Sequence, residues 1–492
     1  AGLDTSMLVI ANIREQVAWA HPDDPEGAYL RAKDQVLMAI ARAKVMEPIA
    51  IKDYPVTKKA LVLGGGISGM NAAAILAESG VQVSLVEKTG SLGGNARRLL
   101  KTWRGKKVSE IIEALEKRLT RNPLVQIFLN SQIENIQGQT GNFISYIKTD
   151  KSPGLEPVTH GALIVATGAR EAKPRGYLYG KHPGVITHQE LDELLLKGKT
   201  DEISKAHSIV FIQCVDSCNN ERPYCSRVCC THAVSRAVFL KEKFPQLDIY
   251  ILYRHMRTYG QRDHFFRKAM KMGVRVKRFS SDEPPRVSMI MELDRDLRPK
   301  GSLKVECFDS LTQSDIVLHP DFVVLATAIE PDPKENTRLS RLLKVPLGTD
   351  GFFQEMHLKL RPCELRRDGF FVAGLAHYPK EIEESMSQAA AAAAKAMAFI
   401  SQERVNPDRL TARVLAHRCD GCGLCVDACS EKALSLCQFV FKGKTKYMAE
   451  VDDSLCSGCG GCSAVCPKDG IGVPGYMPHE IAAQIETLLR AS

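Results

Sequence analysis

The 492-residue sequence lacks several features, and each absence narrows what the protein can be. No apolar run approaches the roughly 20 residues that a membrane-spanning helix needs, so we expect no transmembrane segment. The first ten residues lack a basic stretch followed by a long apolar core, so no secretory signal is expected. The net charge is only +9 and is spread along the chain, which does not indicate nucleic-acid binding.

Cysteine is absent before Cys214, and the 16 cysteines of the chain are concentrated in two runs. Five lie within residues 214–230, nine lie within residues 419–466, and Cys307 and Cys363 stand alone. A secreted disulfide scaffold would spread its cysteines over a short chain, whereas tight runs in a long chain indicate metal ligands. We therefore expect a reduced, cytoplasmic, metal-bearing protein.

The C-terminal cysteines repeat the pattern CxxCxxCxxxC, and the second copy ends in Cys466-Pro467. This is the spacing of a two-cluster ferredoxin, in which three thiolates of each copy bind one [4Fe–4S] cluster and the fourth binds the other. The predicted ligands are Cys419, Cys422, Cys425 and Cys466 for one cluster, and Cys456, Cys459, Cys462 and Cys429 for the second. Zinc is the alternative, but the doubled pattern with its closing Cys-Pro favours clusters. Cys437 is expected to be a buried thiol.

A glycine-rich loop follows the first short apolar run, residues 59–64. The loop reads Gly64-Gly-Gly66-Ile-Ser-Gly69, a helical pattern follows it, and a second apolar run ends in Glu87. This order of strand, loop, helix, strand and acid predicts a dinucleotide-binding site. We expect Gly64 to allow the tight turn, Gly66 to let the backbone approach the pyrophosphate, and Gly69 to let the helix pack on the strand. Glu87 is expected to accept hydrogen bonds from the ribose hydroxyls.

Three further features favour FAD over NAD as the dinucleotide. Gly93-Gly94-Asn95 follows the acid at short range, residues 162–168 are an apolar strand that ends in Ala-Thr-Gly, and residues 368–374 resemble the second flavin motif of disulfide-reductase-like flavoproteins. An NAD-binding Rossmann domain is the alternative. The predicted cofactor-binding residues are Gly64, Gly66, Ser68, Gly69, Glu87, Lys88, Gly94, Asn95, Ala166, Thr167, Gly168 and Gly374.

The middle of the chain begins like a second dinucleotide-binding domain, with a predicted strand over residues 206–213. Cysteines follow this strand in place of a GxGxxG loop, so nicotinamide binding in the usual position is not expected. Four of the five cysteines within residues 214–230 can hold a third [4Fe–4S] cluster. Buried thiols or a regulatory disulfide are the alternative.

Taken together, these motifs resemble the A subunit of heterodisulfide reductase, an iron–sulfur flavoprotein. The resemblance is carried by residues 213–215 and 224–230 around the middle cysteines, by residues 376–385 beside the second flavin motif, and by residues 11–21. It implies one extra cysteine, Cys218, and a set of four ligands for the third cluster. These ligands are Cys214, Cys225, Cys229 and Cys230.

One position departs from the family pattern. The family often has a cysteine after Arg-Glu-Gln that binds an N-terminal cluster, and that position is Val17 here. Either this member lacks the N-terminal cluster domain or the chain is a shortened version.

The resemblance implies an α/β fold of the thioredoxin-reductase type, with an FAD-binding Rossmann-like domain, an inserted second Rossmann-like domain and a C-terminal α+β ferredoxin domain. The predicted domains are an N-terminal helical arm (1–57), the first part of the FAD domain (58–180), the inserted domain with a [4Fe–4S] site (181–330), the second part of the FAD domain (331–405) and the two-cluster ferredoxin domain (406–492).

The resemblance also implies flavin-based electron bifurcation or confurcation inside a complex. The expected partners are heterodisulfide reductase B- and C-like subunits, ferredoxin and an electron-donor subunit, around a homodimerising core. The alternative is a non-bifurcating relay or scaffold subunit of a quinone-interacting, benzoyl-CoA-reductase or sulfur-oxidising complex. A self-contained NAD(P)H:disulfide oxidoreductase is disfavoured, because no redox-active CxxC or Cx4C pair is evident near Asn95.

Two residues beside the second flavin motif, His377 and Lys380, are candidate catalytic residues. A lysine near the reduced isoalloxazine ring would stabilise its anion. The alternative for Lys380 is a solvent-exposed residue at the start of a helix. His21, His232 and His264 are predicted to be ordinary surface or core histidines.

Overall fold

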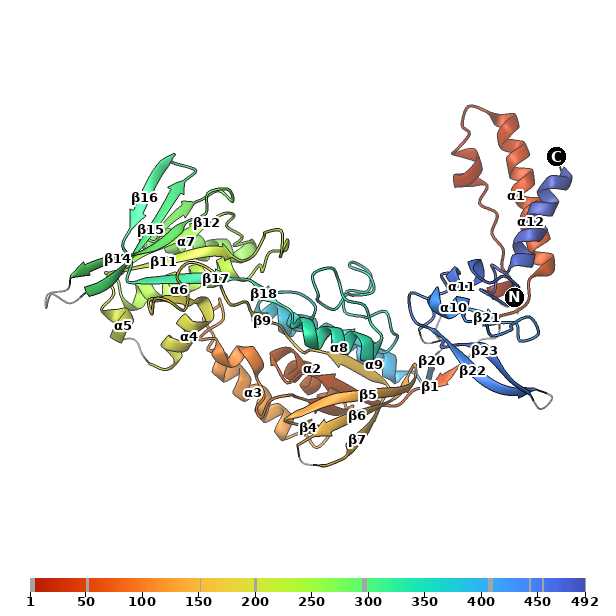
Figure 1. Cartoon of the computed structure of the whole chain (residues 1–492), viewed down its shortest axis with the longest axis horizontal. Helices are drawn as coiled ribbons and strands as arrows, with labels where there is room; N and C mark the ends of the chain where they lie inside the picture. Colours follow the sequence, from red (N-terminus) through yellow and green to blue (C-terminus); the bar gives the residue numbers. More distant parts are fainter. Residues whose placement is uncertain are drawn as a thin grey trace. The chain divides into compact units, whose positions relative to one another are not determined.

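The computed structural model describes residues 5–49, 53–150, 152–198, 201–293, 299–405, 410–441, 444–453 and 455–491. The chain forms two compact units, whose elements are labelled in Figure 1. One unit is Val56–Glu403, and the other joins Ala1–Pro55 to Arg404–Ser492. The predicted domain boundary at residue 406 lies outside the described residues.

A five-stranded parallel sheet positions the glycine-rich loop in the larger unit. Its order is β19-β8-β2-β3-β4. The strands are β2 (Lys59–Leu63), β3 (Gln82–Val86), β4 (Val125–Phe128), β8 (Ala162–Val165) and β19 (Phe370–Val372). The central strand β2 is apolar and buried after Lys59, as expected for a parallel strand that is covered on both faces. The loop therefore begins at the carboxyl end of a buried strand.

Helices cover this sheet. They are α2 (Ile67–Glu78), α3 (Val108–Thr120) and α9 (Ile382–Ser401), and α8 (Pro333–Leu343) lies in the same unit. Helix α9 packs on α2 through alanines such as Ala389 and Ala393, whose small side chains are fully buried and allow close approach. An antiparallel sheet of β5 (Ser131–Gln139), β6 (Asn142–Thr149) and β7 (Leu155–His160) completes the domain.

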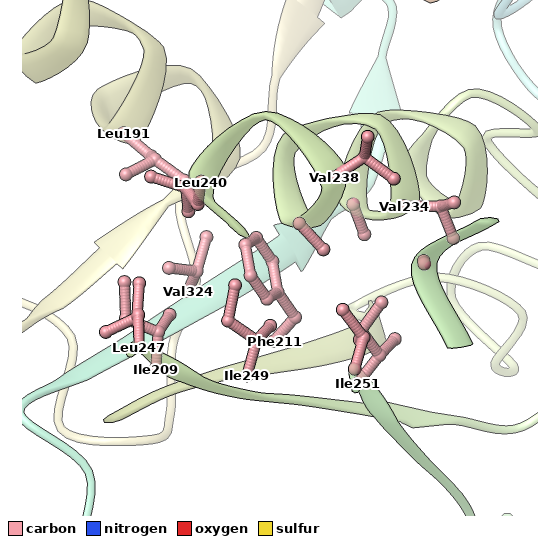
Figure 2. Close-up of a cluster of buried hydrophobic side chains, with 14 of the residues drawn as sticks. Leu191, Ile209, Phe211, Val234, Val238, Leu240, Leu247, Ile249, Ile251 and Val324 are labelled. Carbon is pink, nitrogen blue, oxygen red and sulfur yellow. The ribbon is translucent and has the colours of Figure 1, made fainter. Parts of the chain in front are cut away.

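A second parallel sheet carries the middle cysteines. Its order is β10-β17-β11-β12-β13, and its strands are β10 (Val185–Thr187), β11 (Ser208–Val215), β12 (Asp248–Tyr253), β13 (Arg275–Arg278) and β17 (Phe322–Thr327). Its helices are α4 (His188–Leu196), α5 (Asp201–Ser204), α6 (Cys229–Lys243) and α7 (Asp263–Lys271). Figure 2 shows Ile209 and Phe211 of β11 on the sheet side of α6, in the buried cluster that also includes Val234, Val238 and Leu240 of this helix. Strand β11 begins two residues later than the predicted strand.

Two short strands connect the two parallel sheets. β9 (Arg170–Glu171) leaves the flavin-motif domain and pairs antiparallel with β18 (Ile329–Glu330), which returns to it. A three-stranded sheet of β14 (Arg286–Leu293), β15 (Pro299–Asp309) and β16 (Ser314–Leu318) is appended to the inserted domain. The predicted discontinuous arrangement of the first domain is thus visible in the strand order.

The smaller unit carries the cysteine repeat. Its elements are α1 (Pro25–Val45), β1 (Tyr54–Pro55), β20 (Arg404–Val405), β21 (Arg413–Val414), α10 (Leu424–Asp427), β22 (Leu434–Phe441), β23 (Lys444–Val451), α11 (Gly461–Ala464), β24 (Ile471–Gly472) and α12 (Pro478–Ala491). Helix α1 starts at an Asp24 N-cap followed by Pro25 and packs against α12. No helix among the described residues is long and apolar enough to cross a membrane.

Candidate functional site

A cavity of about 560 Å³ lies in the larger unit and is lined by both of its parallel-sheet domains. Most of the predicted cofactor residues line it, and Lys380 does as well. Gly69 and Gly374 do not line the cavity. The predicted residues in the wall are Gly64, Gly66, Ser68, Glu87, Lys88, Gly94, Asn95, Ala166, Thr167 and Gly168.

The glycine loop has the backbone that its sequence predicts. Gly64 has φ +104°, and a Cβ there would lie 2.3 Å from the Ala166 carbonyl oxygen. A Cβ on Gly69 would lie 1.8 Å from the Gly64 carbonyl oxygen, so only glycine lets α2 approach the loop. At Gly66, by contrast, a Cβ would meet nothing within 4 Å. The open space at Gly66 and the start of α2 form the concavity that suits a pyrophosphate.

Glu87 is buried at the end of β3 and its carboxylate is already oriented by the protein. Oε2 accepts a hydrogen bond from the Gly65 amide at 2.6 Å. Oε1 accepts from the Thr89 amide at 2.8 Å and from the Thr89 hydroxyl at 2.7 Å. The carboxylate therefore lines the cavity in a fixed orientation, and its remaining lone pairs suit ribose hydroxyls.

The wall of the cavity contains buried polar atoms that have no hydrogen-bond partner within the described protein. A buried polar atom without a partner costs about 1–3 kcal/mol, so a wall of such atoms indicates a polar ligand. The atoms are Thr167 Oγ1, His188 Nε2, Gln189 Oε1, Thr231 Oγ1, Thr327 Oγ1 and Glu381 Oε1. Together with the glycine concavity and Glu87, these atoms fit a flavin dinucleotide.

The second flavin motif closes the cavity against α2. Gly374 has φ +70°, and a Cβ there would lie 2.2 Å from the Ser68 hydroxyl. Lys380 is 6% exposed, and its Nζ donates to the carbonyl oxygens of Gly374 at 2.7 Å and Tyr378 at 3.2 Å. Burial lowers the pKa of Lys380 to about 7, and the nearby charge of Arg227 acts in the same direction. The alternative of a solvent-exposed Lys380 is therefore wrong.

His377, the other candidate catalytic residue, is buried but does not line the cavity. Its Nε2 lies 2.9 Å from Glu355 Oε2, and its Nδ1 lies 2.6 Å from Gln388 Nε2. Burial and then the charge of Lys380 lower the pKa of His377. Both ring nitrogens are engaged by protein, so the structure gives His377 a supporting position behind the wall.

Sequence reasoning missed Glu381, the residue that follows Lys380. Glu381 caps the N-terminus of α9, lines the cavity and has an unpartnered Oε1. Burial raises the pKa of Glu381 to about 8, and the neighbouring charges of Glu383 and Glu384 add to the effect. Nothing in the local sequence distinguishes Glu381 from the other acidic residues at the start of this helix, because its burial depends on the inserted domain.

The middle cysteines gather where β11 ends and α6 begins. Cys214 and Cys225 each share a hydrogen bond with the Cys218 thiol, and Cys229 and Cys230 interact at the N-terminus of α6. The thiols of Cys214, Cys225 and Cys230 each interact electrostatically with Cys229. The predicted ligands therefore lie together, and the extra cysteine lies between two of them.

Cys229 and Thr231 also line the cavity, from the first turn of α6. The glycine loop and Lys380 line the same cavity from the other domain. The fold thus places one predicted cluster ligand in the wall of the predicted flavin site, although 135 positions separate Gly94 from Cys229 in the sequence.

The cysteine repeat of the smaller unit is also brought together. Cys419, Cys422, Cys425 and Cys466 line one small hollow, and the other three thiols raise the pKa of Cys425 further after burial. The fourth cysteine of the second copy thus lies with the first three of the first copy. Backbone N–H groups point at the sulfur atoms, such as Gly470 N to Cys466 Sγ at 3.2 Å and Ala412 N to Cys456 Sγ at 3.2 Å. Cys437, expected to be buried, is half-buried.

Among the described residues, no group of three or more His, Cys, Asp or Glu side chains forms a ready-made site for a single metal ion. The cluster assignments therefore rest on the cysteine spacing and on these neighbour relations.

Comparison with known proteins gives two family matches. The pyridine nucleotide-disulphide oxidoreductase family matches residues 26–171 and 58–210, and the 4Fe-4S dicluster domain matches residues 418–470. These matches confirm the predicted fold class.

Similar proteins cover most of the chain. A protein of Archaeoglobus profundus that is named as like the A subunit of heterodisulfide reductase is 29% identical, over 89% of this chain and 80% of its own length. An iron-sulfur A subunit of the CoB–CoM heterodisulfide reductase of Methanopyrus kandleri is 30% identical, over 89% of this chain and 78% of its own length. The A subunit of the H2:CoB-CoM heterodisulfide,ferredoxin reductase of Methanothermobacter thermautotrophicus is 29% identical over the same shares, 89% and 78%.

Proposed function

The chain belongs to the family of heterodisulfide reductase A subunits, oxidoreductase components with FAD and [4Fe–4S] clusters, and from this premise we propose that it divides electron pairs between two acceptors. In this proposal one electron passes through the clusters of the chain to ferredoxin. The other passes to a partner subunit that reduces a disulfide. The name of the Methanothermobacter relative, which includes both a heterodisulfide and ferredoxin, supports these two acceptors.

The observation that carries the proposal is the shared cavity wall. Cys229, a predicted ligand of the middle cluster, lines the cavity together with the flavin-motif residues Gly66 and Asn95. Electron transfer falls off steeply with distance, and a cluster held by Cys229 would lie beside a flavin bound in this cavity and would supply one-electron transfer there. Bound FAD supplies the conversion between two-electron and one-electron chemistry.

The residues of the chain bind and orient the cofactor around this exchange. Gly66 and the N-terminus of α2 take the pyrophosphate, and Glu87 takes the adenosine ribose. Lys380 has a pKa of about 7 in the buried wall, so it can carry positive charge beside a reduced flavin or lose it. The predicted third cluster is held by Cys214, Cys225, Cys229 and Cys230.

A second candidate function, a non-bifurcating relay, is favoured by Val17. This residue replaces the cysteine that the family often has there, and its side chain is 2% exposed inside the short π-helix Arg14–Ala18. A buried apolar side chain at this position holds no cluster, so electrons that enter this unit need another route.

The first experiment is analysis of iron, acid-labile sulfide and flavin in anaerobically purified protein. Three cubanes require roughly 12 Fe per FAD, and two require about 8. A value near 8 would remove the middle cluster and leave the relay function. With the larger value, ferredoxin reduction is then assayed with and without a disulfide-reducing partner, and reduction that does not depend on the partner would reject bifurcation.

A further inference from the structure

The middle loop, residues 214–230, contains five cysteines, whereas a [4Fe–4S] cluster takes four cysteine ligands. The four predicted ligands leave Cys218 without a role. Its side chain is half-buried, as are those of the predicted ligands Cys214 and Cys225. The loop therefore contains one spare thiol, and what this thiol can do depends on which ligands it approaches.

Hydrogen bonds within the loop bring Cys218 next to Cys225. The Cys218 amide donates to the Tyr224 carbonyl oxygen at 3.2 Å, and the Ser217 hydroxyl donates to the same oxygen at 3.1 Å. Cys218 Sγ lies 3.7 Å from that oxygen as well. Since Tyr224 directly precedes Cys225, these contacts close the chain between the two cysteines and bring their thiols together.

The Cys218 thiol lies between two predicted ligands. It shares one hydrogen bond with the Cys214 thiol and another with the Cys225 thiol. A cysteine side chain has three staggered rotamers, and a change of rotamer moves its sulfur by a distance comparable with such a contact. The Cys218 sulfur is therefore close enough to either ligand to compete with it for the same iron.

The other two predicted ligands have different neighbours. Cys229 and Cys230 hydrogen-bond to each other in the first turn of α6. The thiols that act on Cys229 are those of Cys230, Cys214 and Cys225, which are themselves predicted ligands. The spare thiol is thus associated with Cys214 and Cys225, the two ligands that precede the helix.

The backbone holds Cys218 in an uncommon conformation. Its φ is +55°, in the left-handed region where residues other than glycine are rare. The Tyr224 carbonyl accepts from its amide on one side, and Arg254 donates to its carbonyl at 3.1 Å on the other. Strain of this kind persists only where the surroundings impose it, and it is concentrated at functional sites.

We propose that Cys218 is a reserve ligand of the middle cluster, which binds the iron that Cys214 or Cys225 otherwise binds. The inference rests on the proposed function, which includes this cluster. In the exchange, the bond between iron and the sulfur of Cys214 or Cys225 breaks, and that sulfur takes up a proton. The Cys218 thiol releases its proton and forms the new iron–sulfur bond, since only the thiolate is a ligand. No electron is transferred.

The test compares the iron and acid-labile sulfide of three full-length variants, C214A, C225A and C229A, purified anaerobically. Each lacks one predicted ligand, and alanine offers no donor atom in its place. C214A and C225A are expected to keep about 12 Fe per FAD, whereas C229A is expected to keep about 8. Adding C218A to C214A or to C225A is expected to lower their iron to about 8. Equal iron in each single variant and its double variant would overturn the inference.

Alkylation identifies the ligand directly. Native protein is treated anaerobically with iodoacetamide, and labelling of Cys218 is read by mass spectrometry. In C214A, Cys218 is expected to be protected until a chelator removes the iron, because its sulfur is bound. In C229A, which has lost the cluster, Cys218 is expected to be labelled from the start. Labelling of Cys218 in iron-replete C214A would overturn the inference.

A further measurement covers the case in which the ligand variants fail to fold. C218A keeps all predicted ligands, but it is expected to lose the iron of the middle cluster to a chelator about tenfold faster than wild type, because no second thiol recaptures iron beside Cys214 and Cys225. C307A replaces a buried thiol on β15 of the same domain and is expected to lose iron at the wild-type rate. Equal rates in C218A and wild type would overturn the inference.

Failure of the proposed function gives a different result. Wild-type protein would then contain only about 8 Fe per FAD, and the single and double variants of the middle loop would contain the same amount.

Discussion

The two cysteine-rich regions of the chain reach similar groupings of thiols by different means. In the C-terminal repeat, residues with positive φ beside the cysteines include Gly421, Gly423, Gly458 and Gly460. In the middle loop no glycine occurs between Gly198 and Gly260, and the positive φ angles fall on Cys214, Asp216, Cys218 and Arg227. Non-glycine residues in this conformation cost about 1–3 kcal/mol each and persist only where the surroundings hold them.

The surroundings of the middle loop supply that support. Tyr224 donates to the Ile329 carbonyl at 3.1 Å, the Ile329 amide donates to Ser226 at 2.9 Å, and Arg254 donates to the Cys218 carbonyl at 3.1 Å. The positive φ angles of the repeat are therefore supplied by local glycines, whereas the middle loop, residues 214–230, is held by contacts from β18 and from Arg254, the residue after β12. Four predictions test this difference, from the largest expected effect to the smallest.

Substitution of Cys229, the predicted cluster ligand that lines the cavity, is expected to have the largest effect on the iron content. C229S should lose the middle cluster, about 4 Fe per chain, and keep the two clusters of the repeat. Iron and sulfide analysis with EPR of the remaining clusters checks this. C218S is the matched control and should keep all of the iron, because Cys218 is the extra thiol. Equal iron in C229S and wild type would show that the middle loop holds no cluster.

A glycine substitution in the C-terminal cysteine repeat is expected to lower stability through the local backbone geometry alone. In G421A, the Cβ would lie 2.4 Å from the Tyr447 carbonyl oxygen at φ +74°, so the backbone must move. We expect a loss of stability above about 1 kcal/mol and reduced iron in the first cluster. Gly460 has a similar φ of +78° with nothing near a Cβ, so G460A isolates the conformational cost and should lose less. Equal losses would mean that the contact with Tyr447 has no effect.

A contact from helix α9, made by Glu384, is expected to stabilise the middle loop. Glu384 Oε1 on α9 accepts from the Tyr259 hydroxyl at 2.6 Å and from Arg262 at 3.1 Å, and it lies 3.4 Å from Arg227 of the loop. E384Q is expected to lower the free energy of unfolding by about 1–3 kcal/mol, because charged hydrogen bonds are lost, and to speed iron loss from the middle loop only. E242Q, which breaks the exposed pair with Lys268, should change stability by less than about 1 kcal/mol. Iron loss from both regions in E384Q would contradict the comparison.

The prediction with the smallest expected effect on the iron content concerns Glu381 and the pH dependence of stability. The folded state raises the pKa of Glu381 from its ordinary 4.5 to about 8, so it retains a proton that the unfolded chain releases. Its contribution to stability is present below pH 4.5 and is lost as the pH rises towards 8, by up to about 1.4 kcal/mol per pH unit. Lys380 acts in the opposite direction only above about pH 7, and the buried histidines with lowered pKa are common to wild type and E381Q, so the difference between their urea midpoints as FAD-free protein at pH 5, 6 and 7 reports Glu381. E381Q should flatten this slope, and an unchanged slope would place the titration elsewhere.

Sequence reasoning identified what is encoded in short stretches. The glycine loop, its following helix and Glu87 lie within 24 residues, and their backbone requirements can be read from residue type. It missed Glu381, His188 and Asp192, because an acid or a histidine has no local mark of burial. It also treated His232 as an ordinary histidine, although His232 lines the cavity and joins His188 to Asp192.

The sequence by itself determined the ligand spacing of the repeat, the dinucleotide loop and the family, since each depends on residues a few positions apart along the chain. Only the tertiary structure decided that Cys229 lines the same cavity as the predicted flavin motifs, that Lys380 is buried, and that His188, His232 and Asp192 lie in one series of contacts. The physical reason is that burial, pKa and hydrogen-bond direction are set by neighbours from other elements, and the packing of the inserted domain on the flavin domain brings those neighbours together.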